Sequence, residues 1–313
     1  MLVIFNPTAG RRKAGRLWAV LDVLVGHGVR LDVAETRAPG HARTLAAEAV
    51  RAGRGPVVAA GGDGTVAEVA DGMAAGAAAA GAGSTEVALG IVPLGTANVL
   101  AHELHLPASP LGLASALAFG RSRPLWPGRV RGAGGERLFV QMLGVGFDAQ
   151  VVHGVSTRTK RAIGRGAYVV QTLRELPRYG FPPIRVVVDG EAHAAGSVIV
   201  AKGGLYGGPY MLAPEAATDA PGFSAVLFEH AGVGAALLAG AALPLNRLGR
   251  LPGVRRLRAS RVVIEAPEPL PAQADGDACG WTPLVVEDAA VPLRVLTGEM
   301  ATATGRGVAR AAE

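Results

Sequence analysis

In the first 120 residues, short runs are interspersed with longer segments of helical periodicity. Each short run is either apolar throughout or alternates between apolar and polar residues. The short runs predict strands over Leu2–Phe5, Val29–Ala34, Pro56–Ala60 and Glu86–Val92. Apolar residues spaced three or four apart predict helices over Arg16–Gly26, His41–Ala52, Thr65–Met73, Thr96–His105 and Ser109–Phe119. The Ala/Gly-rich segment Ala74–Ser84 is expected to be a loop. Strands that alternate with helices of this length predict a doubly wound parallel sheet.

The pattern changes near Gly120, after which the apolar runs are short, rich in β-branched residues and separated by Gly and Pro. They are Leu138–Leu143, Ile184–Val188, Ser197–Ala201, Ala225–Phe228, Arg261–Ala266, Leu284–Val286 and Leu293–Thr297. Such runs are typical of an antiparallel β-sandwich. We therefore predict an α/β chain with a parallel-sheet nucleotide-binding domain over residues 1–124, a β-rich domain over 125–298 and a tail over 299–313. The end of the chain is a candidate for packing back on the first domain.

Composition narrows the class of protein. Of the 313 residues, 50% are hydrophobic and 18% are charged, which excludes a disordered chain. A single cysteine, Cys279, excludes an internal disulfide framework and a cysteine-based zinc cluster. The net charge of +6 lies mostly in the middle of the chain and suits a phosphate-bearing ligand or an anionic membrane surface. Aromatic residues are too few, at 4%, to favour binding of nucleic acid.

Targeting signals are not evident. The longest smooth apolar run, Ala231–Leu245, is shorter than the ~20 residues that a transmembrane helix needs. The first residues place apolar side chains before basic ones, the reverse of a signal peptide. We therefore expect a cytoplasmic protein.

Three polar loops that contain glycine follow predicted strands: Asn6–Lys13 (NPTAGRRK), Gly61–Thr65 (GGDGT) and Pro93–Asn98 (PLGTAN). In an open parallel sheet, ligands bind beyond the carboxyl ends of the strands, so we expect the three loops to form one crevice. Glycine backbone amides at helix N-termini bind anions. Together with the short basic run, these features predict a site for a nucleotide triphosphate.

Single residues in these loops leave alternatives open. Asp63 is unexpected in direct contact with phosphate, so it acts either through a metal or by accepting hydrogen bonds from loop amides. Thr65 either caps the following helix or binds phosphate, and capping residues routinely follow strands in loops without a ligand.

Two familiar nucleotide-binding motifs are excluded or weakly matched. Gly10–Leu17 is not a Walker A loop, because arginine and leucine replace its lysine and hydroxyl residue. Gly144–Ala149 lacks the context of a dinucleotide fingerprint.

NPTAG, GGDGT and PLGTAN, in this order and spacing, resemble the diacylglycerol kinase catalytic fold, whose family includes bacterial lipid kinases and the sphingosine and ceramide kinases. The resemblance covers roughly Met1–Gly298. In the second half it rests on FVQMLGVGFDAQVV, KGGLYGGPYMLAP, the Asp-Gly pair within Ala274–Asp277, and VPLRV.

The resemblance implies an ATP-dependent lipid kinase that uses Mg²⁺. Asp275 would be the general base that takes the proton of the lipid hydroxyl, and Asp63 would help to organise Mg²⁺ and phosphate. Contacts with the nucleotide are implied for Asn6, Gly10, Thr36, Gly61, Gly62, Asp63, Gly64, Thr65, Gly95, Thr96, Asn98 and Asp277, the last in place of a more usual Glu. From the residues alone, Asp275 and Gly276 form an ordinary hairpin turn.

The chain departs from the family pattern at two further points. Trp126-Pro127-Gly128 stands where members often carry an acid before a turn. Thr218–Gly222 stands where bacterial members often have an Asp-Gly pair that supplies an acid to a metal site. A second, structural metal is therefore doubtful, and Asp219 is its best remaining ligand.

The acceptor side is suggested by two basic clusters and the apolar run that precedes the second. The clusters are Arg158, Lys160, Arg161 and Arg165, and then Arg247, Arg250, Arg255, Arg256, Arg258 and Arg261. They fit peripheral docking on anionic lipid, although solvated loops in an arginine-rich chain explain them nearly as well.

The leading hypothesis is a kinase of diacylglycerol or of a sphingoid or ceramide-type lipid, held at the membrane surface, with a homodimer left open. The alternatives are a kinase of a soluble acceptor such as NAD, and a non-catalytic protein that binds lipid or nucleotide on the same fold.

Overall fold

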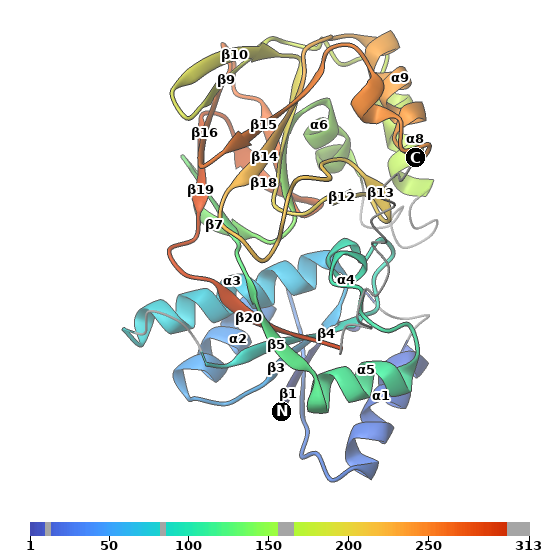
Figure 1. The fold of residues 1–313 in the computed structure, drawn as a ribbon, viewed down its shortest axis with the longest axis vertical. Coiled ribbons are helices and arrows are strands. Elements are labelled where there is room, and N and C mark those ends of the chain that lie inside the picture. Colours follow the sequence, from blue (N-terminus) through green and yellow to red (C-terminus); the bar gives the residue numbers. More distant parts are fainter. Residues whose placement is uncertain (10–13, 82–85, 156–165, 299–313) are drawn as a thin grey trace, which may run out of the picture.

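The computed structural model of the chain describes residues 1–9, 14–81, 86–155 and 166–298. It contains two bodies stacked along the long axis, an α/β domain that carries the N-terminus and a domain built mainly of strands (Figure 1). Among the described helices, none combines the length and the hydrophobicity that crossing a bilayer requires.

The first domain is a six-stranded sheet with helices on both faces. The strand order is β2-β1-β3-β4-β20-β5, and the strands are β1 (Leu2–Phe5), β2 (Asp32–Glu35), β3 (Val57–Gly61), β4 (Ala88–Pro93), β5 (Arg121–Leu125) and β20 (Leu293–Thr297). All neighbours pair in parallel except β5, which is antiparallel to β20. The helices are α1 (Ala14–Gly26), α2 (His41–Arg51), α3 (Asp63–Ala79), α4 (Val99–Glu103) and α5 (Pro110–Phe119).

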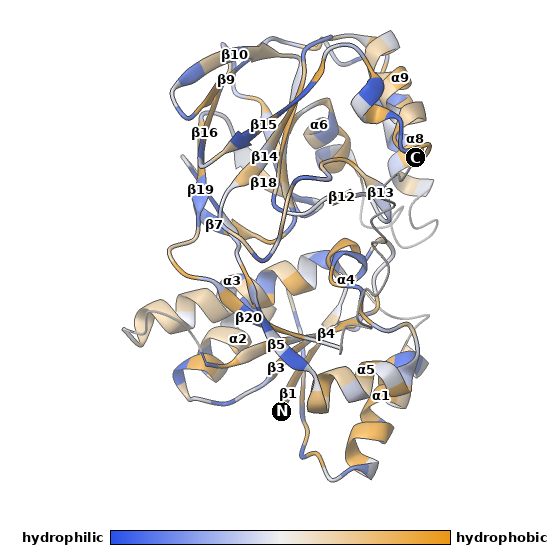
Figure 2. Ribbon diagram, viewed as in Figure 1, coloured by the Kyte–Doolittle hydropathy of each residue, from blue (hydrophilic) through white to orange (hydrophobic). Residues whose placement is uncertain are grey.

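The two faces of this sheet form separate cores. The apolar side chains of α2 and α3 pack on one face, and those of α1 and α5 pack on the other. Hydrophobic residues are concentrated in these central strands (Figure 2). The prediction of a doubly wound parallel sheet is therefore confirmed.

The second domain is a sandwich of two antiparallel sheets, as predicted. One sheet, in the order β10-β9-β16-β19-β6-β7, consists of β6 (Gly128–Gly132), β7 (Gly135–Phe139), β9 (Ile184–Val188), β10 (Glu191–Ala195), β16 (Arg261–Glu265) and β19 (Leu284–Asp288). The other, in the order β15-β14-β11-β8-β17-β18, consists of β8 (Met142–Gly146), β11 (Ser197–Ala201), β14 (Phe223–Phe228), β15 (Val254–Ala259), β17 (Pro271–Ala274) and β18 (Asp277–Trp281). Their inner faces share one core of β-branched and aromatic residues.

The connections of the second domain hold its remaining elements. They are α6 (Phe147–Gly154), α8 (Gly166–Glu175), α9 (Val233–Ala242), the 3₁₀ turn Leu248–Arg250, and a short hairpin of β12 (Leu205–Tyr206) and β13 (Tyr210–Met211).

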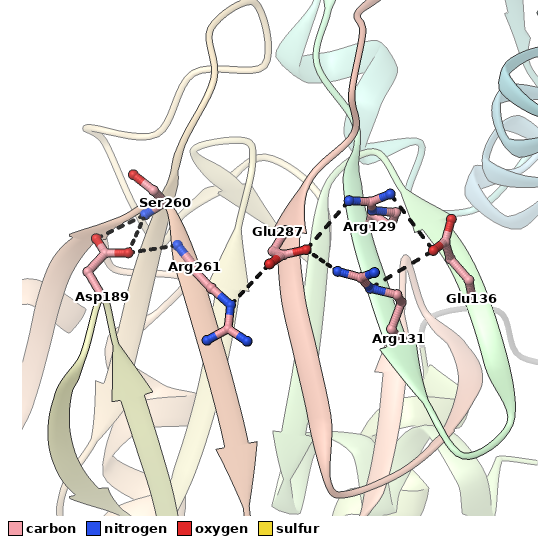
Figure 3. A network of polar contacts seen from close by, with 7 residues as sticks. All are labelled: Arg129, Arg131, Glu136, Asp189, Ser260, Arg261 and Glu287. Atoms are coloured by element: carbon pink, nitrogen blue, oxygen red, sulfur yellow. Dashed lines mark hydrogen bonds and ion pairs between the residues drawn. The ribbon is translucent and has the colours of Figure 1, made fainter. Parts of the chain in front are cut away.

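A network of ion pairs joins strands of the sheet β10-β9-β16-β19-β6-β7 (Figure 3). Glu287 accepts hydrogen bonds from Arg129 at 3.5 Å, from Arg261 at 3.0 Å and from Arg131. Asp189 accepts from the backbone N–H groups of Ser260 and Arg261, the latter at 2.8 Å. Arg261, which the sequence grouped with a basic cluster, is therefore committed to pairing within the sheet.

The expected loop at Ala74–Ser84 is wrong over its first part, because α3 continues to Ala79. Two glycines in α3 face the backbone of α2. A Cβ on Gly72 would collide with the carbonyl oxygen of Arg43, and one on Gly76 would lie 2.7 Å from that of Ala47. The glycines therefore allow close helix packing, and the alanines around them favour helix.

Two strand predictions also change. Leu138–Leu143 is not one strand, because the chain bends at Val140 and Gln141 between β7 and β8. Leu293–Thr297, grouped with the sandwich, is β20 and lies in the first sheet between β4 and β5 (Figure 1). Its side chains contribute to the cores on both faces of that sheet, as expected for an internal strand. The chain therefore crosses between the domains after β5 and again after β19.

Candidate functional site

A cleft of about 2160 Å³ lies between the two domains. Its wall in the first domain is formed by the loops that follow β1, β2, β3 and β4. Its wall in the second domain is formed by the β17–β18 hairpin and, further along, by apolar residues of α8 and α9. One continuous space thus connects a glycine-rich polar end with an apolar end.

The loops after β3 and β4 are joined backbone to backbone. The N–H groups of Leu94 and Gly95 donate to the carbonyl oxygen of Gly61 at 2.8 and 3.2 Å. A Cβ on Gly95 would lie only 2.5 Å from the Cα of Gly62. Glycine is therefore required at position 95 for this contact, and a Cβ on Gly62 would also be tight, at 3.2 Å from the Cα of Gly95. The contact gives the cleft a floor that an anionic group can approach closely.

Asp63, the first residue of α3, holds the loop after β4. Its Oδ1 accepts a hydrogen bond from the backbone N–H of Val99 at 2.6 Å. Burial raises the pKa of this carboxyl, while hydrogen bonds from the backbone of Val99, Asn98 and Leu100 oppose the rise. Of the two roles that the sequence left open, the hydrogen bond to a loop amide is present, and a contact with metal stays a prediction.

The loop after β1 is tied to α3 by Asn6. Its Oδ1 accepts from the N–H groups of Thr8 and Ala9 at 3.0 and 3.3 Å, and its Nδ2 donates to Oγ1 of Thr65 at 3.0 Å. Thr36 lines the cleft at the end of β2. Gly10 lies outside the described residues. Apart from Asp277, which lies in the second domain, the predicted nucleotide residues in the described part are thus gathered at one edge of the first sheet.

Asp275 lies in a two-residue turn between β17 and β18, where it and Gly276 have φ values of 51° and 83°. Two positive φ values are typical of a type I′ hairpin, so the simple reading of this pair is correct for the backbone. The carboxylate, however, turns back and accepts from the backbone N–H groups of Val140, Gln141 and Met142 at 2.8, 2.9 and 3.0 Å.

Burial and these hydrogen bonds act in opposite directions on the pKa of Asp275. The side chain lines the cleft but is buried, and burial raises its pKa to about 6 while the three backbone hydrogen bonds act in the opposite direction. A carboxylate that titrates near neutral pH is suited to general base catalysis.

Asp277 lies two residues further on and faces the nucleotide loops. A Cβ on Gly64 would collide with its carboxylate, and its Oδ2 lies 3.9 Å from Nη2 of Arg137. One hairpin of the second domain therefore carries two carboxylates into the cleft, one of them directly against the loop after β3.

A buried chain of hydrogen bonds supports this hairpin. Asp148 accepts from the hydroxyl of Tyr206 and from Nε2 of Gln273 at 2.9 Å, and Oε1 of Gln273 accepts from the N–H of Gly276 at 2.8 Å. Burial raises the pKa of both Asp148 and Tyr206. This series of hydrogen bonds was not predicted from the sequence. Only the GVGFDA segment around Asp148 had been noted as a motif.

Gln141 is a second residue that the sequence did not single out. It is 2% exposed and lines the cleft beside Asp275. Neither Oε1 nor Nε2 of its side chain has a hydrogen-bond partner within the described residues. A buried amide in this state has the capacity to bind a polar group of a ligand.

Asp219 is not brought to the cleft. Its Oδ2 pairs with Nη2 of Arg123 at 3.1 Å, and its side chain is 46% exposed. Within the part of the chain that the structure describes, no group of three or more His, Cys, Asp or Glu side chains is arranged to hold a metal. A magnesium ion bound mainly through nucleotide phosphates needs only one or two protein carboxylates, and Asp63 stays a predicted ligand for such an ion.

Comparison with known proteins identifies the family of the chain. Residues 1–130 match the diacylglycerol kinase catalytic domain, and residues 141–297 match the YegS C-terminal NAD kinase beta sandwich-like domain. The chain belongs to the diacylglycerol kinase-like lipid kinase family. The residues between the two matched domains, 131–140, comprise the end of β6, all of β7 and Val140, whose N–H donates to Asp275.

Relatives of this chain span much of its length. A protein of Pseudomonas aeruginosa PAO1 named probable lipid kinase YegS-like is 32% identical over 70% of this chain and 68% of its own. A diacylglycerol kinase of Staphylococcus saprophyticus is 28% identical over 73% and 72% of the two chains. The crystal structure of a diacylglycerol kinase from Bacillus anthracis has the same fold, with a TM-score of 0.69, 18% identity and coverage of 95% and 96%.

Proposed function

We propose that this lipid kinase transfers the γ-phosphate of ATP to a hydroxyl of a membrane lipid, with diacylglycerol or a sphingoid or ceramide-type lipid as the acceptor. The observation that carries the proposal is the placement of Asp275. Its carboxyl lines the same cleft as the glycine-rich loops of the first domain and the apolar residues of α8 and α9.

The polar end of the cleft suits ATP and Mg²⁺. The close approach of Gly62 and Gly95 gives a surface without side chains, and the N-terminus of α3 favours negative charge there. Asp63 and Asp277 are the carboxylates that would hold the ion together with the phosphates. The ion would neutralise charge on the transferring group.

The chemistry requires little of the protein besides positioning and one base. The acceptor oxygen attacks the γ-phosphorus, the bond from phosphorus to the bridging oxygen of ADP breaks, and the hydroxyl proton passes to the carboxylate of Asp275. The backbone amides from Val140 to Met142 hold that carboxylate in one orientation. The neighbouring amide of Gln141 would orient a polar group of the acceptor.

The apolar end of the cleft suits the acyl or alkyl chains of a lipid. Val169 and Leu173 of α8 and Leu237 of α9 line the cleft, yet they are also 62%, 62% and 51% exposed. They therefore lie where the cleft meets the surface. An acceptor whose hydroxyl reaches Asp275 would leave its chains between these two helices.

This opening also has features of a membrane-docking surface. Leu238 and Leu245 are exposed near Leu237, and Arg247 and Arg250 follow as exposed side chains with no side-chain partner within the described residues. Figure 2 shows the apolar helix α9 beside hydrophilic segments. An apolar surface next to arginines favours an anionic bilayer.

Other members of the predicted basic clusters contribute less to this surface. Arg255 pairs with Glu229 at 3.0 Å, and Arg256 lies 3.8 Å from Glu215. The first cluster, Arg158 to Arg165, lies outside the described residues. We therefore assign docking to α8, α9 and the turn after α9.

The test is transfer of labelled γ-phosphate from ATP with Mg²⁺ to a lipid panel in mixed micelles. We expect a labelled lipid with the wild type and loss of the label in Asp275→Asn. A labelled soluble product, or equal lipid labelling by wild type and variant, would contradict the proposal.

Docking is tested separately by sedimentation with vesicles that contain anionic lipid. Leu173→Ser and Leu237→Ser should each weaken binding at least threefold, since each removes an exposed apolar side chain from the opening. The matched control is Leu111→Ser, a 63% exposed leucine of α5 that does not line the cleft. Equal losses in all three variants would refute the assignment of the surface.

A further inference from the structure

Lys202, directly after β11, is a buried cation with a complete set of oxygen partners. Its side chain has no exposed surface. Its Nζ donates to the carbonyl oxygens of Ala220 and Gly222 at 3.0 and 2.8 Å and to Oδ1 of Asp288 at 2.8 Å. An ammonium group has three N–H donors, so these three acceptors satisfy it fully. The ring of Phe223 lies beside the charge, with its centroid 4.9 Å from Nζ.

The oxygens of the turn at Thr218–Gly222 are engaged by other protein groups. The carbonyl oxygen of Thr218 accepts from the N–H of Trp126 at 2.7 Å, and the carbonyl oxygens of Ala220 and Gly222 accept from Lys202. The carboxylate of Asp219 pairs with an arginine, as described above. A cation arriving from solution would have to displace these partners.

A divalent ion does not fit this environment. Calcium takes six to eight oxygen ligands and magnesium requires six in near-octahedral geometry. Two of the carbonyl oxygens that could contribute already bind a positive charge, and a second cation beside that charge would be repelled. We propose that the ammonium of Lys202 is the resident cation of this turn, and that this chain binds no divalent metal at Asp219.

The ammonium of Lys202 lies beside the segments in which the chain crosses between the domains. Asp288 ends β19 just before the crossing to β20, and its Oδ2 accepts from the N–H of Gly222 at 2.6 Å. The other crossing, at Trp126 and Pro127, bonds to the same region, because Trp126 donates to Thr218 and Pro127 accepts from the N–H of Ala289 at 2.9 Å. The ammonium therefore ties the turn to one crossing segment, and backbone hydrogen bonds tie it to the other.

The chain beyond Lys202 also contacts the first domain. The carboxylate of Glu103, at the end of α4, accepts from the N–H groups of Gly204 and Leu205 at 3.2 and 3.0 Å. Lys202 thus anchors one end of a segment that touches both domains and continues to Tyr206 in the cleft. It follows that the placement of the domains does not depend on the concentration of divalent ions.

The experiment is thermal unfolding of the full chain without nucleotide, in EDTA and in increasing calcium or magnesium, together with the metal content of the purified protein. A bound ion would raise the melting temperature with concentration. We expect an unchanged melting temperature, less than a tenth of an equivalent of bound metal, and the same behaviour in Asp219→Asn. A rise with either ion in the wild type that Asp219→Asn removes would overturn the proposal.

A second variant tests the ammonium directly. Lys202→Met keeps an unbranched side chain, one atom shorter, but removes the charge, and it leaves Oδ1 of Asp288 and the carbonyl oxygens of Ala220 and Gly222 without their donor. We expect its melting temperature to fall by several degrees, whereas Asp219→Asn should melt like the wild type. A Lys202→Met protein as stable as the wild type would overturn the proposal. If this variant does not fold, the metal titrations of the wild type and Asp219→Asn remain decisive.

Discussion

The pH dependence of phosphate transfer provides a direct test of Asp275 as the base. Burial raises the pKa of its carboxyl to about 6, and only the ionised form can take the hydroxyl proton. For a pKa near 6, the ionised fraction falls from about 0.9 at pH 7 to about 0.1 at pH 5. We therefore expect kcat/KM to fall about tenfold over this interval and to level off above pH 7.

Replacing Asp275 by Asn should reduce kcat by about 10²–10⁴-fold, the usual contribution of a general base. The substitution changes the free energy of unfolding through two terms of opposite sign. One is the removal of the carboxyl with its raised pKa, and the other is the loss of a hydrogen-bond acceptor. A folded pKa above the unfolded value of 3.8 means that stability is fully present below pH 3.8 and is lost as pH rises through about 6. By linkage, the raised pKa lowers the free energy of unfolding, relative to its value at low pH, by about 3 kcal/mol at pH 8 and by roughly half of that at pH 5.

The Asn variant avoids this cost but introduces another. Its amide oxygen can still accept from Gln141 and Met142, whereas its NH₂ group would face the N–H of Val140. Leaving that buried donor without a partner costs about 1–3 kcal/mol. The variant should therefore unfold within about 2 kcal/mol of the wild type at pH 8, and its relative stability should worsen by about 1.4 kcal/mol at pH 5.

The assay is the initial rate of lipid phosphorylation from pH 5 to 8.5, with denaturant unfolding at both ends of the range. Phosphate groups also titrate near pH ~6, so the residual rate of Asp275→Asn serves as the control. The rate of this variant still depends on the ionisation of the nucleotide phosphates but no longer on the ionisation of a carboxyl at position 275. Profiles of the same shape in both proteins, or a variant that keeps more than about a tenth of the wild-type rate, would refute the assignment.

Two further predictions concern residues that position the site. Gly95→Ala would place a methyl group against Gly62 and separate the two nucleotide loops, so the KM for ATP should rise at least tenfold in steady-state kinetics. Gly134→Ala, at a glycine with open space around it, is the control and should leave KM unchanged. Gln273→Leu removes the acceptor of the Gly276 N–H and should lower kcat about tenfold with little change in the KM for ATP, because a small displacement of the base slows transfer. A rise in KM without loss of kcat would contradict this role.

The sequence was sufficient for the fold class because the periodicity of apolar residues differs between the two halves of the chain. Its errors arose where the decisive contact is distant. β20 has the same short apolar pattern as the sandwich strands, and its pairing with β4, some 200 residues earlier, is not encoded in that pattern. Similarly, Gly76 and the small residues around it suggest a loop until α2 is present to pack against them.

The same limit applies to the site. The Asp-Gly pair predicts a turn at Asp275, but the direction of its carboxylate depends on a bend at Val140 and Gln141 in another part of the sandwich. The partners of Asp148 are dispersed in the sequence and carry no common pattern. Asp219 was selected only because it was the remaining acid near a family motif. Its pairing with Arg123 is a contact between segments that only the folded chain brings together.

The β17–β18 hairpin would link the two proposed substrates through one short element. Asp275 and Asp277 are separated by one residue of a tight turn, so the proposed base and the carboxylate against Gly64 cannot move independently. The hairpin belongs to the second domain, whereas the nucleotide loops belong to the first. The distance from base to phosphate is therefore set by the placement of the domains. That placement is fixed at the two crossings, where Lys202 and the turn at Thr218–Gly222 lie. With the proposed base held in this way, the opening between α8 and α9 would be the part of the cleft that meets the chains of the proposed lipid acceptor.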